Sequence, residues 1–153
     1  MALIYVSRHG EAEPYAATDA QRPLTAHGCE AVRALWQGML EEGVRPARII
    51  SSPYLRAQQT AAIIAEVMGG LIVETEPLIT PDSRVSDVFQ WLAKQDTLEG
   101  VLFVSHMPLV GQWVGQWTQG IGAAVSMPVA AVAAIAAEQT APAAGVLRWF
   151  RRP

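Results

Sequence analysis

Short apolar runs alternate with segments of helical periodicity over most of the chain. The apolar runs predict strands near residues 3–7, 48–52, 71–75 and 100–105, and the other segments predict helices near 25–42, 53–68, 84–95 and 108–119. Glycines at positions 43, 69, 70 and 120 fall where these helices should end. Tryptophans at positions 36, 91, 113 and 117 lie in the predicted helices, and we expect them to pack against the sheet. The alternation predicts an α/β protein, a three-layer α/β/α sandwich with a mostly parallel central sheet, and we expect a single domain over residues 1–153.

Composition and charge disfavour several classes of protein. Apolar residues make up 51% of the chain, but no run reaches the roughly 18 uncharged apolar residues of a membrane helix. The first residues have no basic segment, so we expect neither a signal peptide nor an anchor, and the single Cys29 excludes an internal disulfide. Eleven basic residues are scattered through a chain of net charge −3, with one cluster at Arg148 to Arg152, so we expect no nucleic-acid partner. We expect a monomer in the cytoplasm.

Two histidines and two arginines occupy comparable places in the predicted pattern. Arg8 and His9 directly follow the first apolar run, and His106 follows the fourth. Arg56 lies one turn into a helix that Pro53 is expected to begin, near backbone N–H groups that favour anions. Because successive βα units bring such strand and helix ends to one edge of a sheet, we expect all four side chains to meet in one crevice.

Each of these signals is weak when taken singly. A histidine beside an arginine at a strand end is more often part of an ordinary polar loop, and Arg56 alone would be typical of a solvated helix residue. Four cationic or potentially cationic groups in one crevice instead indicate an anion such as a phosphoryl group. Two guanidinium groups can bind its oxygens, one neutral imidazole can attack phosphorus, and the second can stabilise oxygen charge.

Longer motifs surround these residues. They are Arg8-His9-Gly10, Ser52-Pro53-x-x-Arg56-Ala57-x-Gln59-Thr60 and Ser105-His106-x-Pro108. In them the chain resembles the histidine phosphatase superfamily, the phosphoglycerate-mutase-like group. Three further segments, Arg22-Pro23-Leu24-Thr25-x-x-Gly28-Cys29, Leu78-x-Thr80-Pro81 and Pro108-Leu109-Val110-Gly111, are similar to those of small bacterial SixA-type phosphohistidine phosphatases. The resemblance covers residues 3 to about 150 and is thin beyond residue 120.

The resemblance implies an enzyme that removes phosphate from a histidine of another protein, a phosphotransfer domain or carrier protein of a bacterial relay. His9 is the predicted nucleophile and would form a phosphohistidyl intermediate. It must be neutral to attack, and repulsion from Arg8 and Arg56 disfavours its charged form. These two arginines would hold the phosphoryl oxygens, and His106 would donate a hydrogen bond to the developing charge. We expect no cofactor and no metal, because no cluster has metal-ligand spacing.

Three further residues complete the predicted substrate-binding set. Arg22 lies in the loop that follows the first strand and could bind phosphate, or it could simply form a salt bridge with Asp19. Asp19 could reach inward from the same loop. Met107 directly follows His106.

The general acid of the predicted reaction is not evident. Many superfamily members place a carboxylate after the third strand, where this chain has Thr80. Glu76 and Asp82 flank Thr80, and Asp19 could reach inward, so the donor is one of these three or is absent. A phosphorylated imidazole can take a proton from solvent and leave as neutral imidazole, whereas an alkyl phosphate has no such route.

The C-terminal segment allows two interpretations. Met127 to Gln139 is rich in alanine and by propensity would be helical. The positions of Val129, Val132 and Ile135, together with the family pattern, instead favour a strand paired with Val146 to Phe150. We expect strands.

We therefore expect a protein phosphohistidine phosphatase. The longest irregular piece near the site, Glu11 to Leu24, is too short for a large lid, and an open site suits a residue displayed on a protein. One alternative is a small-molecule phosphatase of the same superfamily that acts on a sugar or nucleotide phosphate. The other is a phosphate-sensing module without turnover.

Overall fold

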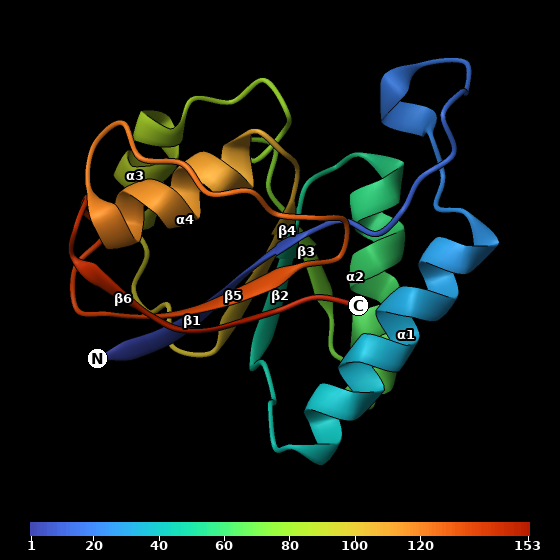
Figure 1. The fold of residues 1–153 in the computed structure, drawn as a ribbon, viewed down its shortest axis with the longest axis horizontal. Helices are drawn as coiled ribbons and strands as arrows, with labels where there is room; N and C mark the ends of the chain where they lie inside the picture. The colour runs from blue at the N-terminus through green and yellow to red at the C-terminus, as the bar shows by residue number, and fades with distance from the viewer.

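One six-stranded sheet runs through the computed structural model, which describes residues 1–153 (Figure 1). The elements are β1 (Ala2–Arg8), the 3₁₀ helix η1 (Asp19–Gln21), α1 (Ala26–Glu41), β2 (Arg48–Ser51), α2 (Leu55–Val67), β3 (Val73–Thr75), α3 (Val85–Leu92), β4 (Val101–Ser105), α4 (Leu109–Gln119), β5 (Val132–Ala137) and β6 (Gly145–Arg151). The strand order is β3-β2-β4-β1-β5-β6. Strands β1 to β4 are parallel, and β5 and β6 are antiparallel to their neighbours.

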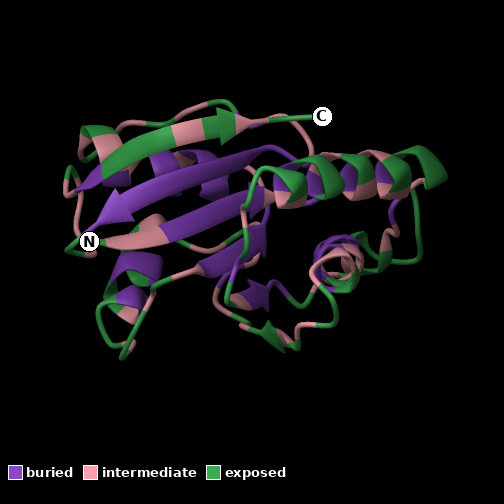
Figure 2. Ribbon diagram, turned by 90° about the horizontal axis from the view of Figure 1, so that it is seen from below, coloured by how far each residue is buried: buried purple, intermediate pink, exposed green.

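The helices cover both faces of the sheet, as Figures 1 and 2 show. Side chains on a strand alternate between its faces, so β1 supplies two separate cores. Ile4 and Val6 join the core beneath α3 and α4, where Trp113 is fully buried. Tyr5 joins the core beneath α1 and α2, together with the buried Trp36. The predicted three-layer sandwich with a mostly parallel sheet is confirmed.

Several predicted boundaries differ from the observed ones. Helix α3 stops at Leu92, and the Gln95 side chain donates to the Trp91 carbonyl at 3.0 Å, which satisfies one of the free carbonyls at a helix end. Helix α2 begins at Leu55 and not at Pro53, so Arg56 lies in its first turn. None of the four α-helices has the length and apolar character needed to cross a bilayer.

The alanine-rich C-terminal segment forms strand β5, as predicted, and pairs with both β1 and β6. Every residue of β5 is buried, because the strand lies inside the sheet with a helical layer on each side. Ala133 and Ile135 contribute to the core beneath α3 and α4, while Val132 and Ala134 contribute to the opposite core. Close packing on two faces thus overrides the helical propensity of alanine.

Candidate active site

The candidate site lies where the carboxyl ends of three parallel strands meet. Parallel pairing sets Arg8 of β1 opposite Ser105 of β4. The His9 N–H donates to the Ser105 carbonyl at 3.0 Å, so this pairing continues one residue beyond the strand. Ser52 continues β2 in the same way, through a 3.0 Å bond to β4. His9, Ser52 and His106 therefore leave adjacent strands at one edge of the sheet.

The His9 imidazole is held in one orientation by its own backbone. Its Nδ1 lies 2.7 Å from the Gly10 carbonyl oxygen, which can only accept, so Nδ1 carries the hydrogen. In the neutral ring Nε2 then carries a lone pair and no hydrogen. This lone pair accepts a hydrogen bond from the Arg56 Nε–H at 3.3 Å. His9 is 6% exposed, so its Nε2 is largely shielded from solvent.

Helix α2 is tied to the end of β1 through Thr60. The Gly10 N–H donates to Thr60 Oγ1 at 3.0 Å, and Thr60 Oγ1 donates to the Arg56 carbonyl at 2.7 Å. Position 10 requires glycine, because a Cβ there would lie 2.8 Å from Val32 Cγ2. The close approach is thus to helix α1, whereas the bonds of Thr60 place the first turn of α2, with Arg56, beside His9.

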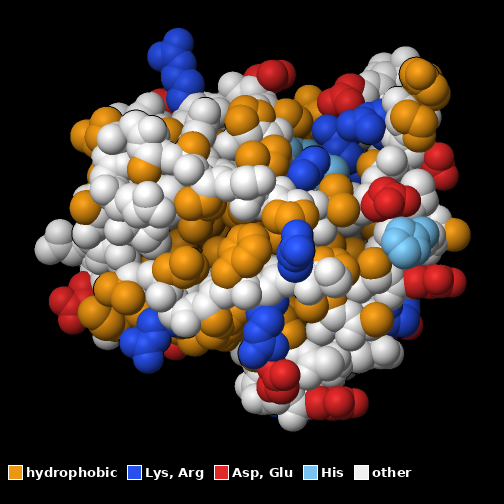
Figure 3. All heavy atoms as spheres, in the orientation of Figure 1, with side chains coloured by type: hydrophobic (Ala, Val, Ile, Leu, Met, Phe, Trp, Pro, Cys, Tyr) orange, Lys and Arg blue, Asp and Glu red, His pale blue; other side chains and the backbone are white.

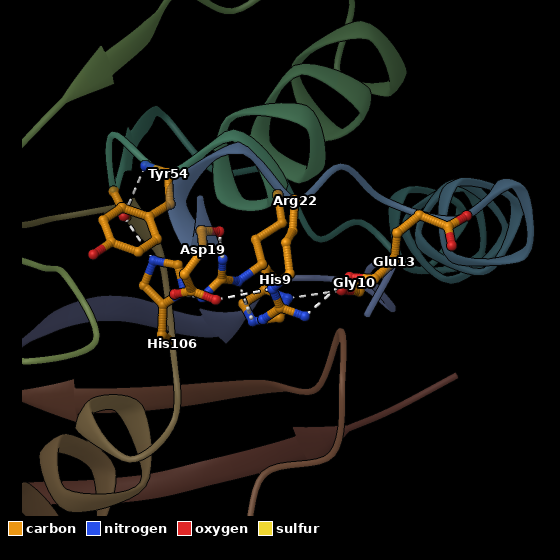
Figure 4. A network of polar contacts seen from close by, with 9 residues as sticks. His9, Gly10, Glu13, Asp19, Arg22, Tyr54 and His106 are labelled. Atoms are coloured by element: carbon orange, nitrogen blue, oxygen red, sulfur yellow. Dashed lines mark hydrogen bonds and ion pairs between the residues drawn. The ribbon is translucent and has the colours of Figure 1, made fainter. Parts of the chain in front are cut away.

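Asp19 bridges the side chains of Arg22 and Arg56, and Figure 4 shows Asp19 and Arg22 close to His9. The Arg56 guanidinium donates to the Asp19 carbonyl at 2.7 Å and to its carboxylate Oδ2 at 3.1 Å. Arg22 Nε donates to Asp19 Oδ1 at 2.9 Å. Arg22 therefore forms the salt bridge with Asp19 that was one of the two roles expected for it, and phosphate binding by Arg22 stays a prediction. The second ion pair of Asp19, with Arg56, was not predicted.

The C-terminal segment secures Arg8 and the backbone of His9. Arg8 donates through Nη1 to the Met127 carbonyl at 3.0 Å and through its backbone N–H to Ala131. The Ala130 N–H donates to the His9 carbonyl at 2.8 Å. Ala130 has φ of 62°, in the left-handed region that residues other than glycine adopt only uncommonly. The segment before β5 thus helps to build the site.

His106 faces His9 across the site, with the two ring centroids 5.1 Å apart. Its Nε2 lies 2.7 Å from Ser52 Oγ, and its Nδ1 is buried with no hydrogen-bond partner. The edge of Tyr54 contacts the His106 ring at 5.0 Å between centroids. The Arg56 guanidinium lies over the face of Tyr54 at 5.1 Å, a cation–π distance. Sequence reasoning did not single out Ser52 and Tyr54, although both belong to the motif around Arg56.

Both imidazoles are kept neutral by their surroundings. Burial lowers the pKa of His9 to about 4, and the positive charges of Arg56 and Arg8 act in the same direction. Burial, followed by His9 and Arg56, lowers the pKa of His106 to about 3. For Asp19, desolvation raises the pKa, but the hydrogen bonds and charges of Arg22 and Arg56 together outweigh it and hold the pKa below its usual value.

The predicted site residues fall into two groups. His9, Arg8, Arg56 and His106 meet at one sheet edge, with Arg22 and Asp19 beside them. Met107 follows His106 along the chain, but its side chain packs against the core beneath α4.

The remaining candidate carboxylates, Glu76 and Asp82, form no hydrogen bond with the histidines. Glu76 accepts from the Leu78 N–H, and Asp82 is exposed. The Thr80 hydroxyl is paired with Ser83. Neither carboxylate forms a hydrogen bond or ion pair with a site residue, whereas Asp19 does. No group of three or more His, Cys, Asp or Glu side chains is arranged to hold a metal ion.

Basic side chains gather beside a partly covered histidine at one end of the molecule, with acidic side chains close by (Figure 3). Elsewhere on this face the basic side chains stand singly. The site can therefore attract a compact anion through fixed positive charge, and the unprotonated nitrogen of His9 is of the kind that can act as a nucleophile. A sandwich of this kind, with two histidines and two arginines at the carboxyl edge of its parallel strands, belongs to the class of α/β enzymes that act on phosphoryl groups.

Comparison with known proteins identifies the family. Residues 4–80 match the model of the histidine phosphatase superfamily (branch 1). The chain is 33% identical over 120 residues to the phosphohistidine phosphatase SixA of Escherichia coli K12, covering 76% of this chain and 74% of that protein. It is 35% identical over 128 residues to the SixA homolog of Haemophilus influenzae, covering 74% and 75% of the two chains. This protein belongs to the histidine phosphatase superfamily, and the predicted hydrolase class is confirmed.

Solved structures agree with this assignment. A protein histidine phosphatase SixA complexed with tungstate superimposes with a TM-score of 0.88 and 29% identity, covering 99% of this chain and 97% of that one. A mycobacterial glucosyl-3-phosphoglycerate phosphatase shares the fold at a TM-score of 0.74 and 14% identity, covering 100% of both chains. The architecture is thus common to relatives whose names refer to protein and to small-molecule substrates.

Proposed function

We propose that this protein is a protein phosphohistidine phosphatase in which His9 is the nucleophile. The observation that carries the proposal is the unprotonated Nε2 of His9, set 3.3 Å from the Arg56 guanidinium in a fold shared with SixA. The substrate would be a histidine-phosphorylated phosphotransfer domain or carrier protein of a signal relay. The enzyme would act on it as a monomer in the cytoplasm.

The reaction has two steps. His9 Nε2 attacks phosphorus while the P–N bond of the substrate histidine breaks, and that imidazole takes a proton from solvent as it leaves. Water then attacks the phosphohistidyl intermediate, and inorganic phosphate leaves as His9 is restored. Arg8 and Arg56 balance charge on the transferring oxygens, and His106 donates to one of them.

The site favours leaving groups that need no acid. Asp19 is the only candidate carboxylate bound at the site, and its two arginine contacts hold its pKa low, so it stays ionised at neutral pH. We expect kcat/KM for a phosphohistidine protein to exceed that for a phosphoserine peptide by on the order of 10²-fold or more, because a serine alkoxide leaves badly unprotonated. Isotope release from both substrates under identical conditions measures this ratio.

Asp19→Asn serves as the companion variant in that experiment. Since the carboxylate is ionised, we expect the variant to leave the ratio between the two substrates unchanged. A wider gap in the variant would make Asp19 the proton donor. Comparable rates for both substrates in the unmodified enzyme would contradict the proposed specificity and favour a broader phosphatase with Glu76 or Asp82 as acid.

The pH response of His9 gives a second test. An ordinary imidazole, with pKa 6.5, gains its proton near neutrality, whereas burial and two arginines place that of His9 near 4. We therefore expect the His9 ring to stay neutral, and able to attack, from pH 8 down to about 5, with protonation and loss of nucleophile only below this. NMR titration of the imidazole protons measures it directly, since the chain has three histidines. A midpoint near 6.5 would contradict the burial seen at the site.

A further inference from the structure

We propose that Ser52 is a positioning residue that holds His106 in the tautomer protonated on Nδ1, so that Nδ1–H is the donor offered to the phosphoryl group. The inference rests on the proposed function only for the role of His106 as a donor. The tautomer itself follows from the hydrogen bonds around the two side chains.

Ser52 is held by hydrogen bonds of both its backbone and its side chain. Its backbone N–H donates to β4 at 3.0 Å, and β4 is the strand that leads into His106. Its Oγ lies 2.7 Å from His106 Nε2 and accepts the Tyr54 N–H at 3.2 Å. Ser52 and His106 are 0% and 1% exposed, so solvent cannot supply substitute partners to either side chain.

The partners of the hydroxyl decide the direction of the 2.7 Å bond. A serine hydroxyl has one hydrogen and two lone pairs, and the Tyr54 N–H uses one lone pair. If His106 Nε2 carried the hydrogen, it would take the second lone pair. The serine hydrogen would then be buried without an acceptor, which is unfavourable. If Ser52 donates instead, its hydrogen and the Nε2 lone pair satisfy each other.

One polar group of His106 then remains unpaired. Neutral His106 with its Nε2 accepting must carry its hydrogen on Nδ1, and Nδ1 is the buried ring atom without a partner. An N–H with no protein acceptor is suited to the charge that develops on phosphoryl oxygens, whereas a bare lone pair there would repel them. Tyr54, packed edge-on against the ring, helps to keep the imidazole in this orientation.

Nitrogen NMR of the unmodified enzyme at neutral pH tests the tautomer without any turnover. We expect His106 Nδ1 to show the shift of a protonated nitrogen and Nε2 that of an unprotonated one. Replacing His9 and His27 in turn assigns the signals of the three histidines. An unmodified enzyme with the hydrogen on Nε2 of His106 overturns the proposal. The spectrum remains decisive even if His9 is not the nucleophile, so the two proposals fail separately.

Ser52→Ala tests the consequence for catalysis. Without the hydroxyl we expect mixed tautomers of His106 and a kcat for aryl phosphate lower by on the order of 10-fold, with KM nearly unchanged, because the donor acts on charge in the transition state. Ser51→Ala is the matched control: Ser51 is equally buried, but its hydroxyl donates to the Ser52 carbonyl at 2.9 Å and does not contact His106. The control should keep both the tautomer and kcat. A loss of kcat in Ser52→Ala with an unchanged His106 spectrum would reduce Ser52 to a structural role and overturn the proposal.

Discussion

His9→Ala is expected to abolish turnover and to leave the fold intact. The substitution removes the nitrogen that attacks phosphorus, and the other imidazole at the site is already bonded to Ser52 through Nε2. We expect kcat/KM to fall by at least about 10³-fold, because loss of a nucleophile removes the covalent route itself. The backbone bonds of position 9, to Ser105 and from Ala130, survive in alanine, so thermal unfolding should change little.

Isotope transfer makes this test specific. With a labelled phosphohistidine protein, the unmodified enzyme should carry label after an alkaline quench, and the His9→Ala variant should not. His27→Ala is the control, because it removes an exposed imidazole of helix α1 that has no contact with the site. Near-normal activity or retained labelling in His9→Ala would show that the proposed mechanism is wrong.

Arg56→Ala should produce the second largest loss, on the order of 10²-fold or more in kcat/KM. Arg56 is 4% exposed and reaches His9 Nε2 directly, so its charge acts on the transferring group with little screening by water. Removing this charge should also raise the pKa of His9, because a like charge that disfavours the protonated ring is lost. Kinetics and NMR titration measure the two effects on one variant.

A matched arginine separates this role from general loss of charge. Arg33 lies in helix α1, is paired with Glu66 at 3.0 Å, and has a side chain that is 41% exposed. Arg33→Ala should change neither kcat/KM nor the His9 titration, since exposed ion pairs contribute little. If Arg56→Ala were equally mild, Arg56 would be the solvated helix residue that its position alone indicates.

The parts of the fold that could be predicted from sequence are those with strong local signals. The continuous apolar run of β4 reflects burial on both faces, and all five residues of that strand are buried. The strand Val132–Ala137 could be predicted only with the family pattern, because its alanines favour a helix until neighbouring strands and helices enclose them.

The site also has features that could be predicted from sequence and features that could not. His9 and His106 could be predicted to meet because each follows a strand directly, and parallel pairing brings strand ends together. The contact of Asp19 with Arg56 joins the short 3₁₀ helix η1 to a residue of α2 that lies 37 positions further along the chain, and no periodicity indicates it. The bond from Ser52 to His106 depends on the register between β2 and β4, which apolar runs alone do not specify.

The ion pair between Asp19 and Arg56 has a consequence for the binding of anions. We expect an anion that binds Arg56 to compete with a carboxylate already held at 3.1 Å. A single negative charge gains little from this exchange, whereas a phosphoryl dianion brings more charge and more acceptor oxygens. The Asp19 side chain is 59% exposed, so it can swing outward into water at small cost and return as phosphate leaves. We therefore expect Asp19 to weaken the binding of monoanions at Arg56 more than that of phosphoryl dianions.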